Sequence, residues 1–125
     1  MRILVLEDSA VMRKIIVKHL LEIGIGEDEI VESHNGTDAL RKITSSEYDL
    51  MILDIIMDGV DGIFVFKAAK AVQPNVKVII CSTFSKKEAV RELIDLGIDD
   101  FVVKPFSSEK LKDSLLRTLS KWSDS

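Results

Sequence analysis

The sequence has few of the residues that support covalent cross-links or membrane insertion. Its single cysteine, Cys81, cannot form a disulfide within the chain, which fits a reducing compartment. No apolar stretch reaches the ~18 residues of a membrane-spanning helix. The N-terminus "MRILVLED" lacks the long apolar core of a signal peptide. These absences exclude a disulfide scaffold and a membrane protein, and we expect a cytoplasmic location with no membrane partner.

The sequence also lacks an excess or a long run of basic residues. Its 17 Lys and Arg are outnumbered by 21 Asp and Glu, for a formal net charge of −4 at pH 7. Nucleic-acid binding needs a basic patch that neutralises phosphates, so we expect no nucleic-acid partner. The length of 125 residues and the 46% hydrophobic content are those of one globular domain. Residues 1–125 are therefore expected to form a single domain.

Short apolar runs alternate with segments of helical period along the chain. The runs lie at residues 3–6, 29–33, 50–54, 76–81 and 100–103. The first, third and fourth are almost continuously apolar, which is typical of strands buried on both faces of a parallel sheet. Five such strands, each followed by a helix, predict an α/β fold with a doubly wound, five-stranded parallel sheet and five helices. In the fourth helix, the period predicts that Val90, Leu93 and Ile94 are buried.

Polar side chains stand where the predicted strands end. Glu7 and Asp8 follow the first strand, Asp54 ends the third, Ser82 follows the fourth and Lys104 follows the fifth. In an open α/β sheet, ligands bind beyond the carboxyl ends of the strands. The sequence therefore predicts that these five side chains converge on one edge of the sheet.

Three carboxylates held close together must be compensated. Two unit charges ~4 Å apart at an effective dielectric constant of ~20 repel by about 4 kcal/mol, so the group must raise its pKa values or bind a cation. Carboxylate oxygens without His or Cys neighbours favour Mg²⁺ over Zn²⁺. With Lys104 and the Ser82 hydroxyl, such an ion would form a cradle for a phosphoryl group. Asp54 is then the natural nucleophile.

Four segments together carry a family resemblance: "ILVLEDS", "DLMILDIIMDGVDG", "IICST" and "DDFVVKPF". Each is weak alone, but all four occur in order and at strand ends. The chain resembles the receiver domains of two-component response regulators, and most closely the single-domain, CheY-like chemotaxis regulators. The resemblance implies a flavodoxin-like sheet with the strand order 2-1-3-4-5.

The resemblance also implies roles for individual residues. Asp54 corresponds to the phosphoacceptor, and Lys104 to the lysine that pairs with the phosphoryl oxygens. Asp8 and Asp54 correspond to direct Mg²⁺ ligands and Glu7 to a carboxylate that acts largely through water. The backbone carbonyl of Ile56 would supply a further metal ligand.

Two further pairs of residues have counterparts in the family. Ser82 corresponds to the hydroxyl that contacts the phosphoryl group, and Phe101 to the aromatic residue whose rotamer follows activation; together they would form the switch. Ile56 and Phe84 occupy the positions that stand over the phosphoryl group. Both are apolar here, which predicts slow self-dephosphorylation because neither side chain can orient an attacking water.

The implied function is that of a stand-alone response regulator. A histidine kinase would donate the phosphoryl group. A target protein would then bind the face formed by the fourth helix, the strand 100–103 and the last helix. The chain would be a signalling switch without an output domain, and it would catalyse only its own phosphorylation and dephosphorylation. It would act as a monomer or a transient dimer. Chemotaxis is the pathway that the resemblance favours. The alternative left open is an intermediate phosphorelay receiver that passes the phosphoryl group to a histidine phosphotransfer domain.

Three other classes of protein fit the sequence less well. Haloacid-dehalogenase-type phosphatases need a second Asp two residues after the nucleophile, where this chain has Ile56. A flavin-binding module would need a loop rich in hydroxyl residues and glycine after the first strand. An interaction module that cannot be phosphorylated should lack one of Asp8, Asp54 or Lys104, and all three are present.

Overall fold

The computed structural model describes residues 1–55, 62–83 and 87–123, with only the backbone described at 87–90 and 121–123. The strands are β1 (Ile3–Leu6), β2 (Ile30–Ser33), β3 (Leu50–Leu53), β4 (Lys77–Ser82) and β5 (Asp100–Val103). The helices are α1 (Ala10–Glu22), α2 (Gly36–Ser45), α3 (Gly62–Val72), α4 (Lys87–Asp95) and α5 (Ser108–Ser123), and a short 3-10 helix, η1 (Glu27–Glu29), precedes β2.

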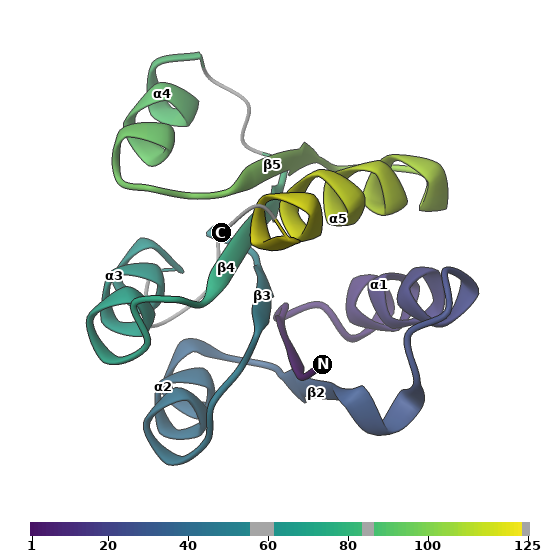
Figure 1. The fold of residues 1–125 in the computed structure, drawn as a ribbon, viewed down its shortest axis with the longest axis horizontal. Helices are drawn as coiled ribbons and strands as arrows, with labels where there is room; N and C mark the ends of the chain where they lie inside the picture. Colours follow the sequence, from purple (N-terminus) through teal and green to yellow (C-terminus); the bar gives the residue numbers. More distant parts are fainter. Residues whose placement is uncertain (56–61, 84–86, 124–125) are drawn as a thin grey trace.

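The strands form one parallel sheet in the order β2-β1-β3-β4-β5. Helices α1 and α5 cover one face of the sheet, and α2, α3 and α4 lie on the other (Figure 1). The doubly wound, five-stranded α/β fold and the strand order are both confirmed. The order reverses between β1 and β3, which is where ligands bind in sheets of this kind.

Alternate residues of each inner strand fill two separate cores. In β1, Leu4 and Leu6 pack into the core beneath α2, α3 and α4, while Ile3 and Val5 pack beneath α1 and α5. All four are at most 1% exposed. Each fully buried aliphatic side chain contributes roughly 1.5–3 kcal/mol relative to exposure. Burial on both faces explains why the inner strands appear as continuous apolar runs.

Ser9 and Gly24 set the ends of α1. The Ser9 hydroxyl oxygen accepts a hydrogen bond from the backbone N–H of Met12 at 3.2 Å, which caps the first turn. Gly24 has a φ of +100°, a left-handed conformation that is inexpensive only for a residue without Cβ. Because Ser9 follows Asp8 directly, this cap fixes where the acidic pair ends and the helix begins.

One expectation about α4 is wrong. Leu93 is 2% exposed as predicted, but Ile94 is 58% exposed. The side chain of Val90, the third residue of this prediction, lies outside the described residues. Successive residues of a helix point about 100° apart, so a helix with a narrow contact on the sheet buries only one of two neighbours. Ile98, beyond the end of α4 and 9% exposed, completes the buried contact instead.

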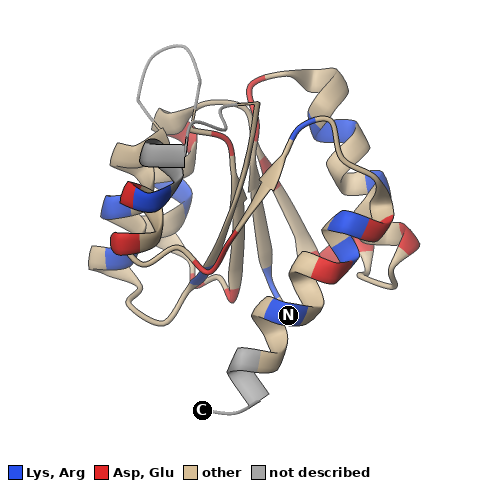
Figure 2. Cartoon of the chain, turned by 90° about the horizontal axis from the view of Figure 1, so that it is seen from above, with Lys and Arg blue, Asp and Glu red and all other residues tan. Residues whose placement is uncertain are grey.

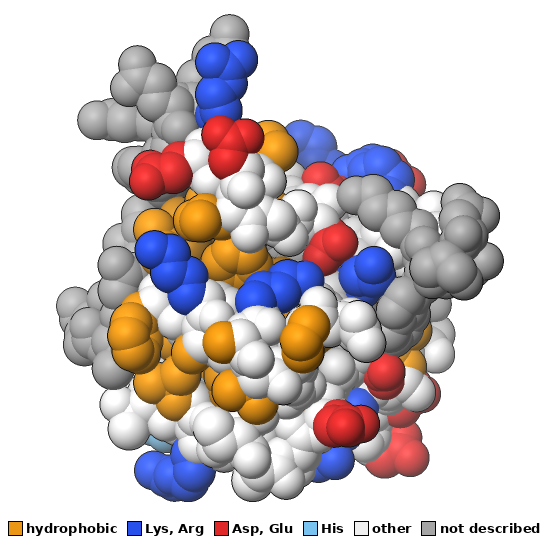
Figure 3. All heavy atoms as spheres, turned by 60° about the vertical axis from the view of Figure 1, so that its left-hand side comes forward, with side chains coloured by type: hydrophobic (Ala, Val, Ile, Leu, Met, Phe, Trp, Pro, Cys, Tyr) orange, Lys and Arg blue, Asp and Glu red, His pale blue; other side chains and the backbone are white. Residues whose placement is uncertain are grey.

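Charged side chains of both signs are interspersed over the helices of the two layers (Figure 2). This distribution agrees with the near-balanced composition. On the face that carries α3 and α4, hydrophobic side chains also reach the surface (Figure 3); Phe64 and Val72 of α3 are 59% and 52% exposed. Within the described ranges, no helix combines the length and the apolar character needed to cross a bilayer.

Candidate active site

The backbone at the ends of β1 and β3 is held by neighbouring strands. Leu6 lies in register with Leu53. The N–H of Asp54 donates to the carbonyl oxygen of Leu6 at 3.0 Å, and the N–H of Glu7 donates to that of Ser33 at 3.1 Å. Glu7 and Asp54 therefore start from fixed, adjacent positions at the carboxyl edge of the sheet.

Three carboxyl groups cluster at this edge. Glu7, Asp8 and Asp54 each place one oxygen so that all three lie within 4.8 Å of one another. Glu7 and Asp54 are 1% and 7% exposed, whereas Asp8 is exposed. The cluster is thus buried on the sheet side and open to solvent at Asp8, the side from which an ion or a phosphoryl donor can approach.

Lys104 brings a positive charge to the cluster. Its ammonium donates to Glu7 Oε1 and, at 3.1 Å, to Asp54 Oδ2. The side chain of Lys104 is only 7% exposed. Its backbone N–H donates to the carbonyl oxygen of Ser82 at 2.9 Å, which holds the segment after β5 against the end of β4. The peptide bond between Lys104 and Pro105 is cis.

Burial and neighbouring charges shift the pKa values of Glu7 and Lys104. Burial and the neighbouring Asp54 raise the pKa of Glu7 to about 7, against the opposing effect of Lys104. Burial disfavours the Lys104 ammonium, but its contacts with Glu7 and Asp54 outweigh this effect and raise the pKa of Lys104. The single positive charge of Lys104 therefore offsets only part of the negative charge of the three carboxylates.

The donor set fits a divalent cation with oxygen ligands. Glu7 Oε2 is buried and has no hydrogen-bond partner among the described residues, so it is available to a cation or to a water bound to one. Three carboxylates without a His or Cys in the cluster match the ligands of Mg²⁺. Ile56, whose carbonyl was predicted as a further ligand, lies outside the described residues.

The Glu7→Gln variant tests this electrostatic balance. In EDTA, the folded state favours the protonated Glu7 carboxyl, and this stabilisation is fully present below the unfolded-state pKa of 4.5. The stabilisation is lost as the pH rises through the folded-state pKa of about 7, because the buried carboxyl then ionises. Gln does not ionise, so the variant should gain roughly 2–3 kcal/mol over the wild type at pH 8 and little near pH 4.5. Urea unfolding at both pH values measures the gain, and an equal gain at both would contradict the assignment.

The predicted switch residues occupy neighbouring strands. Ser82 is the last residue of β4 and is fully buried. Phe101 lies in β5, paired with Ile80, and its half-buried side chain packs against the core beneath α2, α3 and α4. Phe84, one of the two residues expected to stand over the phosphoryl group, lies outside the described residues, as Ile56 does.

Two residues that shape the site were not singled out from the sequence. Arg13 on α1 donates to the backbone carbonyl of Glu7 at 2.7 Å. A Cβ on Gly62, the first residue of α3, would lie 2.3 Å from the backbone oxygen of Asp54, so only glycine allows α3 to start this close. The one available signal for Gly62 was a glycine at the start of an apolar helix. The Arg13 contact depends on tertiary packing and had no local signal.

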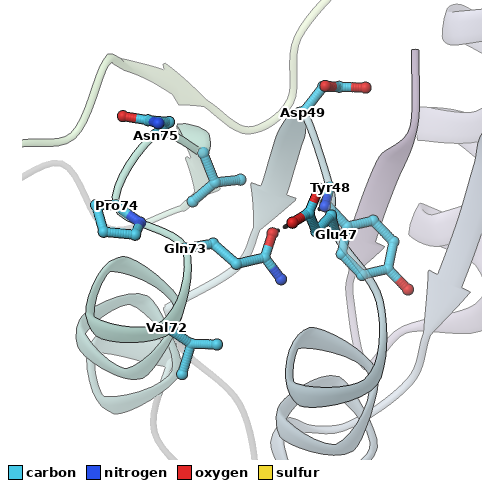
Figure 4. Close-up of a pocket in the computed structure, with 8 residues that line it drawn as sticks. Glu47, Tyr48, Asp49, Val72, Gln73, Pro74 and Asn75 are labelled. Atoms are coloured by element: carbon cyan, nitrogen blue, oxygen red, sulfur yellow. Dashed lines mark hydrogen bonds between the residues drawn. The ribbon is translucent and has the colours of Figure 1, made fainter.

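A cleft of about 250 Å³ lies at the other end of the sheet, between the segments that precede β3 and β4. There the Gln73 side-chain oxygen accepts from the Tyr48 N–H at 2.8 Å (Figure 4). The Gln73 side-chain nitrogen donates to the carbonyl oxygens of Ile43 and Ser46 at 2.8 and 2.7 Å. Gln73 thus ties the end of α3 to the segment between α2 and β3, and the cleft is separate from the acidic site.

The fold and the acidic cluster define the class of protein. Residues 3–116 match the response regulator receiver domain family, and the chain belongs to this family. Receiver domains are the modules of two-component signalling that take a phosphoryl group from a histidine kinase, bind Mg²⁺ at an acidic pocket and interact with target proteins.

Several of the individual relatives are CheY proteins, and others are different response regulators. The chain is 33% identical to chemotaxis protein CheY of Bacillus subtilis, over 95% of this chain and 98% of that protein. It is 32% identical to CheY of Thermotoga maritima, over 91% and 93%. Among solved structures, response regulator TrrA of Thermotoga maritima, in complex with Mg²⁺-BeF, has a TM-score of 0.81 and 32% identity, covering 94% of this chain and 97% of that one. CheY4 of Vibrio cholerae has a TM-score of 0.83 and 25% identity over the same shares.

Proposed function

We propose that the chain is a phosphorylation-activated switch that accepts a phosphoryl group from a histidine kinase onto Asp54, with Mg²⁺ bound, and then binds a target protein. The observation that carries this proposal is the environment of Asp54. Its side chain is 9% exposed, and its carboxylate lies 3.1 Å from the Lys104 ammonium and shares the cluster with Glu7 and Asp8.

The transfer needs a nucleophile and compensation of charge. An Asp54 carboxylate oxygen attacks phosphorus, the O–P bond forms and the N–P bond of phosphohistidine breaks, and the departing imidazole takes up a proton. Lys104 neutralises charge on the phosphoryl oxygens. Mg²⁺, held by Asp8 and Asp54 with Glu7 nearby, would supply further charge neutralisation when bound. Hydrolysis of the acyl phosphate releases orthophosphate and restores the Asp54 carboxylate, so the proposed chain is a switch that catalyses only its own phosphorylation and dephosphorylation.

The output surface is proposed to be the face formed by α4, β5 and α5. Apolar side chains are exposed on all three elements: Ile94 is 58%, Val103 45% and Leu116 56% exposed. A hollow of about 350 Å³ on this face is lined in part by Phe101. Since Lys104 follows β5 directly, a shift of Lys104 toward a phosphoryl group acts on the same strand that carries Phe101.

The full-length similarity to CheY proteins supports a role in chemotaxis. We also propose that the chain is cytoplasmic and acts as a monomer or a transient dimer. An intermediate phosphorelay receiver is the alternative, and it differs in the fate of the phosphoryl group. Incubating the phosphorylated chain with a histidine phosphotransfer domain separates the two, because only a relay receiver should transfer its phosphoryl group rapidly.

Labelling by acetyl phosphate tests the proposed function without knowledge of the kinase. In the presence of Mg²⁺, the intact mass should increase by one phosphoryl group, and the modified peptide should contain Asp54. The label should be lost in hydroxylamine, which cleaves acyl phosphates, and should not form in EDTA. A label on another residue, or one that forms at the same rate in EDTA, would overturn the proposal.

A further inference from the structure

Arg13 of α1 connects the acidic site to the end of β2. Its Nη1 donates to the backbone carbonyl oxygen of Glu7 at 2.7 Å, and its Nε donates to Glu32 Oε1 at 3.1 Å. The side chain of Arg13 is 18% exposed and that of Glu32 49%. The rigid guanidinium therefore engages two acceptors at once, which a lysine ammonium on a flexible stem would do less well.

The carbonyl that Arg13 holds belongs to the peptide group joining Glu7 to Asp8. On the other side of Glu7, the backbone N–H donates to the Ser33 carbonyl oxygen at 3.1 Å. Asp8 lies in the bend between β1 and α1 and is exposed. The direction of its carboxylate thus depends on how firmly this peptide is held, with Arg13 on one side and the Ser9 cap on the other.

The charge of Arg13 is not its main contribution to the site. A lone guanidinium beside a cation site would repel the cation, but Glu32 lies 3.1 Å from Arg13 and offsets much of that charge at longer range. Arg13 and Glu32 together carry no net charge, and the main effect of Arg13 is to fix the position of the Glu7 backbone carbonyl.

We propose that Arg13 is a positioning residue that orients the Glu7–Asp8 peptide for Mg²⁺ binding. The proposal rests on the proposed function in one respect: it takes the cluster of Glu7, Asp8 and Asp54 as the Mg²⁺ site. Groups that orient metal ligands from behind are typically worth 10- to 100-fold in metal affinity. Loss of Arg13 should therefore weaken Mg²⁺ binding while leaving the three carboxylates in place.

The Arg13→Met/Glu32→Gln variant tests this without changing the net charge. Calorimetric titration with MgCl₂ alone should show an affinity about tenfold lower than that of the wild type. The matched control is Arg41→Met/Glu47→Gln, which also keeps the net charge. Arg41 is a 74% exposed arginine on α2 with only a loose pair to Asp38 at 3.8 Å, and Glu47 is exposed after the end of α2. Mg²⁺ affinity should be unchanged in the control.

Further variants separate positioning from folding. Arg13→Lys keeps the charge and one donor, and it should restore Mg²⁺ affinity to within a few fold of the wild type. In acetyl phosphate labelling, the double variant should need about tenfold more Mg²⁺ for half-maximal rate, with the rate at saturating Mg²⁺ unchanged. Wild-type Mg²⁺ affinity in the double variant would overturn the proposal. A loss of Mg²⁺ affinity that Arg13→Lys does not recover, and that accompanies a lower melting temperature, would also overturn it, because Arg13 would then act on folding. Because the titration involves no phosphorylation, failure of Asp54 to accept a phosphoryl group would leave its result intact.

Discussion

The Asp54→Asn variant should form no acyl phosphate with acetyl phosphate and Mg²⁺ under conditions that fully label the wild type. The amide nitrogen and oxygen of Asn lack the nucleophilic lone-pair density and charge of a carboxylate, so the attacking group is lost while the shape of the side chain is kept. Intact-mass spectrometry over a time course measures the loss directly. Labelling of the variant at a rate comparable to the wild type would remove Asp54 from the proposed role.

Misfolding is not expected to explain that loss. The Asp54 carboxylate is one of the groups that raise the pKa of Glu7. Removing its charge relieves the repulsion, and Lys104 keeps Glu7 as a partner. The variant should therefore be at least as stable as the wild type at pH 8 in EDTA, which urea unfolding can check. Asp28→Asn, in the short helix before β2, is the matched control and should label like the wild type.

The carboxyl ends of the strands could be predicted because the signal is local. A buried strand must be apolar on both faces, so the first polar residues after β1 and β3 mark where each strand ends. Parallel pairing then brings Glu7 and Asp54 to the same edge. Sequence alone thus predicted the fold and which polar side chains share that edge, and the structure places Glu7, Asp8, Asp54 and Lys104 together.

The parts that were missed depend on contacts between distant segments. The burial of Leu93 but not of Ile94 depends on how α4 sits on the sheet, because both residues fit the same helical period. The contact from Arg13 to the Glu7 carbonyl leaves no pattern in the sequence, since a surface-type residue turned inward looks like any other arginine. Gly62 belongs to the same group: its close approach to Asp54 becomes visible only when β3 and α3 are both in place.

The lifetime of the acyl phosphate should depend on two apolar residues, Ile56 and Phe84. Both lie outside the described residues, and their positions over the phosphoryl group are an expectation from family resemblance. The described part of the site adds that Asp54 is 7% exposed and that Lys104 contacts it from within. Water must therefore reach the phosphorus from the open side, near Asp8. Apolar side chains there would leave that water without a partner to orient it.

Ile56→Asn and Phe84→Glu are each expected to speed loss of the acyl phosphate by about tenfold, because ~1.4 kcal/mol of transition-state stabilisation is tenfold in rate and positioning of a reactant can supply more than that. The measurement is the decay of the phosphorylated mass after the donor is removed, with Mg²⁺ kept saturating. Val72→Asn is the matched control for the first change, since Val72 is 52% exposed at the far end of α3; its decay rate should equal that of the wild type. If neither variant decays faster, these two side chains do not control the lifetime of the acyl phosphate, and the prediction is wrong.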